Sequence, residues 1–164
     1  MRTIRIGCGA GYSGDRIEPA VELADKGGIR YLVFECLAER TIAIAQQVRM
    51  KDPLAGYDGL LEARMEACLP VCCRNGVKIV TNMGAANPAA GAEKIRDVAR
   101  RLGIRGLTIA AVTGDDVLDR VRQDDPVILE TGRRVAGLGE RLVSANAYLG
   151  AGPVAKALQN GADV

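Results

Sequence analysis

Short apolar blocks alternate along this sequence with stretches of helix length, and this rhythm constrains the fold more than any other feature. Five blocks have the length and composition of strands: residues 3–8, 30–35, 77–82, 106–112 and 141–146. Apolar residues recur at helical spacing over 15–26, 38–50, 59–75, 89–102, 115–122 and 153–160. The alternation predicts a mostly parallel, Rossmann-like α/β sheet with helices on both faces, and part of a βα barrel is the alternative.

The length of 164 residues suits one domain, because such a chain buries about 70% of the surface that it exposes when unfolded. Residues 124–140 break the rhythm and predict irregular structure or a short hairpin. Residues 160–164 read as a helix stop followed by the start of another buried strand. We therefore expect residues 1–164 to be the N-terminal fragment of a longer protein.

Missing residue types exclude several kinds of site. Histidine is absent, which removes Ser-His and Cys-His nucleophile pairs and the commonest general base near neutral pH. The five cysteines are an odd set without framework spacing, so we expect reduced thiols in a cytoplasmic protein. Cys68, Cys72 and Cys73 predict a buried helix face and no metal site, because no histidine or second cysteine pair accompanies them.

Charge and aromatic content bound the possible partners. The net charge is +2, with one Phe, four Tyr and no Trp, which predicts no nucleic-acid binding. No window approaches the ~18 apolar residues of a membrane span, so no membrane partner is expected. A small-molecule substrate is the partner that we expect, and no motif requires a cofactor.

A glycine-rich loop follows the first predicted strand and leads into a helix. Its candidate ligand-binding residues are Gly9, Gly11, Ser13, Gly14, Asp15 and Arg16. Such a loop lets an anion approach backbone amides, with Arg16 as the counter-charge. Residues 9–14 also fit G-x-G-x-x-G, so nucleotide binding is an alternative, and a tight packing turn is another.

Polar residues follow the second and third strands. Glu35 ends an apolar run, so we expect a partly desolvated carboxylate with a raised pKa that suits proton transfer, or else a helix cap or a partner for Arg16 or Arg40. Cys36 is a candidate nucleophile or core filling. Asn82, Gly84 and Asn87 predict an oxyanion or carboxylate clamp, with turn chemistry as the alternative.

The fourth and fifth predicted strands also end in polar residues. Asp115 and Asp116 are expected either to cap the next helix or to face the cleft. Asn146 and Tyr148 stand beside small residues and predict a second polar wall of the ligand site.

Four segments together, IRIGCGAGYSGDRIEPA, YLVFECLAERT, VTNMGAANP and VSANAYLGAG, resemble the N-terminal part of the acyclic terpene utilisation family, a bacterial catabolic family. The resemblance covers essentially all 164 residues. It implies a setting in the breakdown of citronellol- and geraniol-like compounds through coenzyme A thioesters, and it supplies no catalytic residues.

Two functional hypotheses follow. In the first, an enzyme of terpene or branched-chain acid catabolism acts on a carboxylate or acyl-CoA thioester by proton transfer, hydration or lyase chemistry. Glu35 is then the acid/base, and Asn82, Asn87 and Asn146 orient oxygens. In the second, a non-catalytic ligand-binding or assembly subunit works with another copy of itself or with an enzyme of the same pathway.

Overall fold

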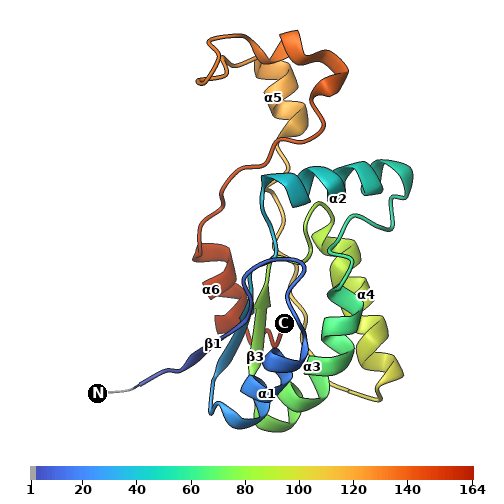
Figure 1. Ribbon diagram of the computed structural model, residues 1–164, viewed down its shortest axis with the longest axis vertical. Helices are drawn as coiled ribbons and strands as arrows, with labels where there is room; N and C mark the ends of the chain where they lie inside the picture. Colours follow the sequence, from blue (N-terminus) through green and yellow to red (C-terminus); the bar gives the residue numbers. More distant parts are fainter. Residues whose placement is uncertain (1–2) are drawn as a thin grey trace.

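The computed structural model describes residues 3–164, which form an open parallel sheet flanked by helices (Figure 1). Its three strands are β1 (Ile6–Ala10), β2 (Tyr31–Phe34) and β3 (Lys78–Thr81), in the order β1-β2-β3. The register pairs Ile6 with Tyr31, and Leu32 with Ile79. The predicted α/β class is therefore confirmed, and the strands form an open sheet with no closure into a ring.

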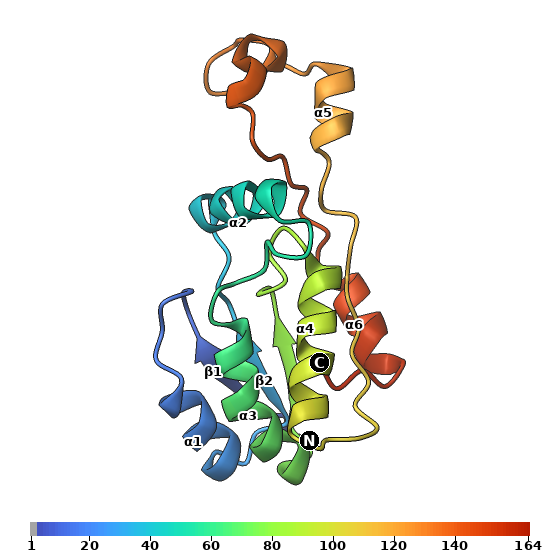
Figure 2. The same cartoon turned by 90° about the vertical axis from the view of Figure 1, so that its right-hand side faces the viewer.

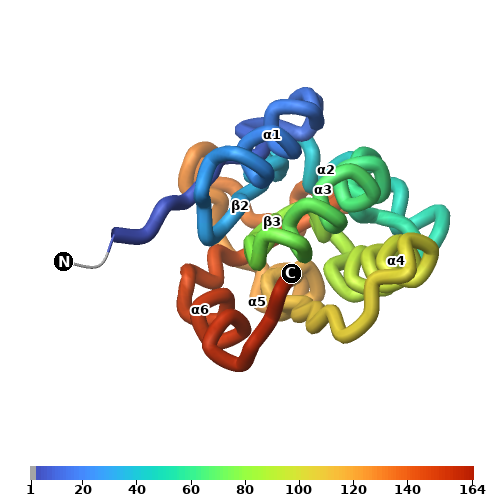
Figure 3. The backbone as a smooth tube through the Cα atoms, turned by 90° about the horizontal axis from the view of Figure 1, so that it is seen from below, coloured from blue at the N-terminus to red at the C-terminus, as the bar shows by residue number. Residues whose placement is uncertain are grey.

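Helices cover the two faces of the sheet unequally. Three of them pack on one face: α1 (Glu18–Lys26), α3 (Leu61–Asn75) and α4 (Pro88–Arg101). On the other face α6 (Gly152–Gln159) lies beside β3 (Figure 3). Ile6 is 66% exposed and Cys8 is also exposed, so much of this second face is open at β1.

The main core lies between the sheet and α1, α3 and α4. Leu32, Phe34 and Ile79 are buried on alternate strand positions, as expected for a sheet with one covered face. Met65 and Leu69 of α3 meet them. The helix α2 (Glu39–Lys51) crosses above the carboxyl ends of the strands (Figure 2).

The predicted fourth strand is present only as an extended segment. The Ala110 N–H donates to the Val164 carbonyl at 2.8 Å, and the Ile79 N–H donates to the Asp163 carbonyl at 2.8 Å. Residues 163–164 therefore lie between β3 and residues 108–110 and continue the sheet. These few bonds make a ladder too short for a full strand.

The predicted fifth strand, 141–146, is wrong. Residues 113–150 leave the sheet as an arm that carries α5 (Leu118–Asp124) and the 3-10 helix η1 (Val135–Arg141) (Figure 1). Isolated antiparallel bridges join Asp116 to Asn146 and Val127 to Arg134. The second bridge agrees with the irregular or short hairpin expected over 124–140. Over the residues described, no helix has the length and apolar character needed to cross a membrane.

Gly9 supports the fold by packing, because a Cβ at this position would stand 2.6 Å from the Phe34 ring. We expect Gly9→Ala to lower the free energy of unfolding by about 1–3 kcal/mol through overpacking. Gly59→Ala is the matched control, since nothing lies within 4 Å of its added Cβ. Urea denaturation of both variants measures the difference, and equal stabilities would contradict the packing role.

Candidate functional site

Two adjacent strand ends are joined by a polar pair, Glu35 and Asn82, which we call the rim. The Asn82 Nδ2 donates to Glu35 Oε1 at 2.9 Å, and the Leu37 N–H donates to the same oxygen at 3.1 Å. The Cys36 N–H donates to Asn82 Oδ1 at 2.7 Å. The parallel register causes this meeting, because Phe34 pairs with Thr81 and the next residues leave the sheet together.

The expected desolvation of Glu35 is wrong. Phe34 points into the core, so the following side chain turns outward, and Glu35 is exposed. Its pairing with Arg16 is also not found, because Arg16 forms an exposed ion pair with Glu18 at 3.5 Å. Glu35 is thus a solvent-facing carboxylate with one oxygen fixed by two donors.

Cys36 is unsuited to act as a nucleophile. It is 3% exposed, and burial raises the pKa of its thiol to about 11 despite the opposing charge of Arg64. The thiol is therefore protonated near neutral pH. Cys36 thus has the core-filling role that was the alternative to a nucleophile. Cys68 and Cys72 are likewise buried, and burial raises the pKa of Cys68 to about 11.

Arg64, on α3, lies fully buried beneath the rim. Its Nη2 donates to the carbonyls of Ser13 at 2.8 Å and Asp15 at 3.0 Å. Its Nη1 contacts Cys36 Sγ at 3.2 Å and Met83 Sδ at 3.5 Å. One cation thereby joins the loop after β1 to the ends of β2 and β3.

Asp58 is the counter-charge. Its Oδ1 lies 3.6 Å from Arg64 Nη1, and its side chain is 6% exposed. The Ser13 hydroxyl donates to Asp58 Oδ2 at 2.7 Å, and the Leu60 N–H donates to Oδ1 at 2.8 Å. Nε of Arg64 has no hydrogen-bond partner within residues 3–164. The pair is therefore almost wholly withdrawn from solvent.

Asp58 and Arg64 are not among the site residues expected from the sequence, although one signal for Arg64 was present. Leu61, Met65 and Cys68 share the buried face of α3, and Arg64 falls on that face between them. A charged residue at a core position of an amphipathic helix needs a partner.

The glycine-rich loop already holds a carboxylate of its own. Asp15 Oδ2 accepts the N–H of Gly11 at 2.6 Å and the N–H of Tyr12 at 3.2 Å. These are amides that a bound anion would use. A Cβ on Gly14 would meet the Tyr12 ring at 2.5 Å, so the ring lies against this turn.

Asn87 and Gly84 build the turn before α4. The Asn87 side chain accepts the Ala90 N–H at 3.3 Å, and its Nδ2 donates to the carbonyls of Pro53 and Ala55. A Cβ on Gly84 would stand 2.8 Å from Pro88. Both residues have the turn role that was the alternative to ligand contact.

Asp115 and Asn146 join the two ends of the arm. The Asn146 Nδ2 donates to Asp115 Oδ2 at 2.9 Å. Asp116 accepts the Leu118 N–H at 3.2 Å at the start of α5 and pairs with Arg49 at 3.3 Å. Tyr148 is 98% exposed, so these residues do not form a closed second wall.

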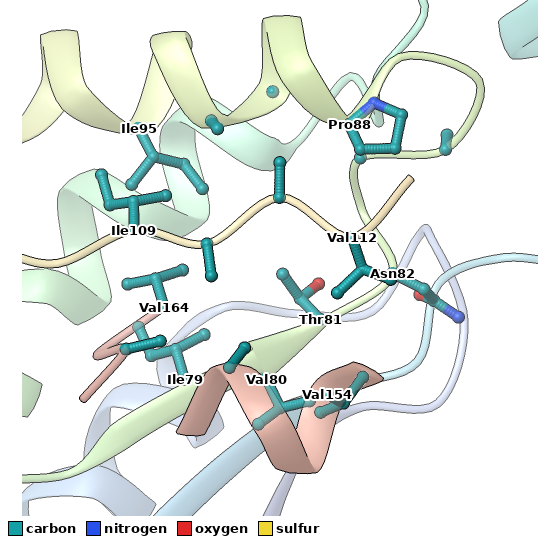
Figure 4. Close-up of a pocket in the computed structure, with 18 of the residues that line it drawn as sticks. Ile79, Val80, Thr81, Asn82, Pro88, Ile95, Ile109, Val112, Val154 and Val164 are labelled. Atoms are coloured by element: carbon teal, nitrogen blue, oxygen red, sulfur yellow. The ribbon is translucent and has the colours of Figure 1, made fainter. Parts of the chain in front are cut away.

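An apolar cavity of about 280 Å³ lies between β3 and residues 109–112, and we call it the slot (Figure 4). Ile79, Val80 and Ile109 line its middle, and Asn82 and Asp115 lie at its polar end. Among the residues described, no three His, Cys, Asp or Glu side chains are grouped to hold a metal ion.

The chain matches a known protein family over nearly all of its length. The model of the family described as acyclic terpene utilisation family protein AtuA matches residues 4–164. No curated protein and no solved structure matches the chain significantly.

The Arg64 pair supplies a test of what holds the strand ends together. Arg64→Met leaves the Asp58 carboxylate buried without a counter-charge, so we expect the free energy of unfolding to fall by about 3–5 kcal/mol. Adding Asp58→Asn removes the unpaired carboxylate. The double variant should therefore lose less free energy of unfolding than the sum of the losses in Arg64→Met and Asp58→Asn.

Arg101→Met is the control, because Arg101 forms ion pairs with Glu62 and Glu66 on the surface and should change stability little. Denaturant unfolding measures all four variants. Equal losses for Arg64→Met and Arg101→Met would contradict the role of the buried pair.

Proposed function

Because the chain belongs to the acyclic terpene utilisation family, we propose that it is a cytoplasmic enzyme of acyclic terpene or branched-chain acid catabolism. Its substrate is a small carboxylate or an acyl-CoA thioester. The reaction is a proton transfer, hydration or elimination at the rim, with Glu35 as the acid/base.

The observation that carries this proposal is the fixed, exposed carboxylate of Glu35. Two donors hold Oε1, while Oε2 has no hydrogen bond within the part of the chain described. A carboxylate held in one orientation and open to solvent on the other side can accept a proton from a bound molecule. With no histidine in the sequence, a carboxylate is also the natural choice for this role.

Asn82 supports the same chemistry. One hydrogen of its Nδ2 is given to Glu35, and its Oδ1 is held by the Cys36 N–H. The second Nδ2 hydrogen can donate to a carboxylate or thioester oxygen, which would orient the acyl group beside Glu35. Asn87 and Asn146 are left out of the proposal because their amides serve the turn and the arm.

The arm favours a second candidate, a non-catalytic assembly subunit of the same pathway. Leu129 is 92% exposed and Tyr148 is 98% exposed on a segment that projects beyond the strand ends (Figure 2). Exposed apolar and aromatic residues on one projecting element suit contact with another protein or a second copy of this chain.

We expect Glu35→Gln to lower turnover of citronelloyl- and geranoyl-CoA by about 100-fold or more, because the amide cannot take the proton. Glutamine keeps the oxygen that Asn82 contacts, so thermal stabilisation of the protein by the thioester should remain. Glu39→Gln, a change at an exposed acid in the first turn of α2, is the control. Unchanged turnover in Glu35→Gln would exclude the acid/base role.

For the second candidate we expect the isolated protein to show no turnover and to copurify with an identified pathway enzyme. Leu129→Ser together with Tyr148→Ser should then abolish the complex in size-exclusion chromatography with light scattering. Leu54→Ser is the control, since Leu54 is 79% exposed but lies outside the arm. A complex that survives the double change would rule out the arm as its contact surface.

A further inference from the structure

The arm, residues 113–150, has few contacts with the rest of the protein, which we call the body. Within residues 3–164, neither of the two apolar core clusters includes a residue of the arm. Over the same residues, one side-chain contact is the only polar link between the arm and the body: Arg49 of α2 lies 3.3 Å from Asp116. An element held so weakly can change its position without disturbing the core.

The two chains at the base of the arm are joined into one unit, which we call the stalk (residues 115–117 and 145–147). The Val117 N–H donates to the Ala145 carbonyl at 2.9 Å, and the Ala147 N–H donates to the Asp115 carbonyl at 2.7 Å. These bonds run in both directions between antiparallel chains, as in a short ladder. The two chains therefore move together, because separating them would break the bonds.

A glycine with positive φ stands in each of the two connections just outside the stalk. Gly114 has φ +106° and precedes the stalk, and Gly150 has φ +71° and follows it. Nothing lies within 4 Å of a Cβ added at either position, so packing does not require glycine there. Glycine instead supplies backbone freedom, because it adopts positive and negative φ at similar cost. The two glycines therefore suit a pair of hinges.

An open cleft separates the arm from α2. Its volume is about 630 Å³, and it lies between Gln46, Arg49 and Met50 of α2 and residues 116–120 of the arm. Met50 is 70% exposed although it lines this cleft. Movement of the arm toward α2 would take the Met50 side chain out of water, which favours a closed position.

We propose that the arm is a hinged lid, which turns at Gly114 and Gly150 and closes onto α2. Because α2 crosses above the carboxyl ends of the strands and the arm projects beyond it (Figure 2), the closed lid lies over the strand ends. The pair of Arg49 and Asp116 is the latch that holds the extended position. Arg49 also donates to the Ala86 carbonyl at 2.7 Å, which fixes the guanidinium to the turn before α4.

The lid acts on the site through Asp115, which belongs to the stalk. Asp115 lines the polar end of the slot together with Asn82, and Asn82 donates to Glu35. Turning the stalk therefore moves a polar residue relative to the rim and brings the arm over the exposed carboxylate, which excludes water as other enzyme lids do. The motion is independent of the reaction, and only its effect on Glu35 rests on the proposed acid/base role.

Distances between two spin labels test this motion, with double electron–electron resonance as the measurement. The labels are attached at Leu54→Cys in the body and Leu129→Cys in the arm, where the side chains are 79% and 92% exposed. We expect two populations of distances, one for each position of the lid. Labels at Leu54→Cys and Leu102→Cys, which are both in the body, are the control and should give one population.

Labelling is confined to the introduced cysteines. Cys8→Ser and Cys73→Ser remove the two exposed native thiols. Cys36, Cys68 and Cys72 are buried, and burial raises the pKa of the Cys36 and Cys68 thiols to about 11 and that of Cys72 to about 12. These three thiols are therefore protonated near neutral pH and stay unlabelled.

The latch supplies the second part of the test. Asp116→Asn removes the charge that pairs with Arg49. We expect this change to raise the ratio of closed to extended lids by about two- to fivefold, the effect of losing an exposed ion pair. Glu140→Gln, at an exposed carboxylate elsewhere in the arm, is the control and should leave the ratio unchanged. Glu35→Gln should also leave it unchanged, so this test and the turnover test can fail separately.

Three outcomes would overturn the proposal. One narrow population of distances between the arm and the body, the same in Asp116→Asn, would show a rigid arm. A broad distribution whose shape Asp116→Asn leaves unchanged would show a flexible segment with neither a latch nor a closed position. A shorter distance that disappears when labelled protein is diluted with unlabelled protein would come from contact between copies.

Discussion

The buried pair of Arg64 and Asp58 is the interaction on which the arrangement of the strand ends depends. Taking both charges out of water has a large desolvation cost, and a mutual approach of 3.6 Å offsets it only with additional hydrogen bonds. Those bonds come from different parts of the chain: Ser13 from the loop after β1, and Leu60 from the start of α3. Displacement of any one element would leave a buried charge short of partners, so the loops can adopt few alternative arrangements.

The geometry of the rim depends on the buried pair of Arg64 and Asp58. The sulfur of Cys36 accepts a hydrogen bond from Arg64, and the N–H of Cys36 donates to Asn82. The residue next to Glu35 is therefore fixed both by the buried cation and by the end of β3. Glu35 itself remains exposed. A rigid layer beneath an accessible carboxylate is how binding groups are usually held, because the supporting residues limit rotamers while the reactive group stays open to the ligand. The arm lacks such support, since its residues bury only Val135 fully.

Local periodicity was sufficient to predict α2, α3, α4 and α6 to within one or two residues at each end. It also predicted the three strands of the sheet, although β1 begins three residues later than expected. It also predicted that Glu35 and Asn82 follow the second and third strands. That these two strands are neighbours came from the structure, because alternating elements predict parallel direction and do not fix the order of the strands. Periodicity failed at 141–146, because this apolar block lies within the arm and has no strand beside it. It also failed for Asp15, which was expected to contact a ligand and instead accepts an N–H of its own loop. A glycine-rich loop whose amides bind its own carboxylate and one whose amides bind an external anion can have the same sequence pattern.

Asn82 connects the slot to the rim. It lines the polar end of the slot together with Asp115, and its side chain donates to Glu35. In a parallel sheet, ligands bind at the carboxyl ends of the strands, where both features lie. The apolar slot and the polar rim therefore share one residue, and a substitution of Asn82 would disturb both at once.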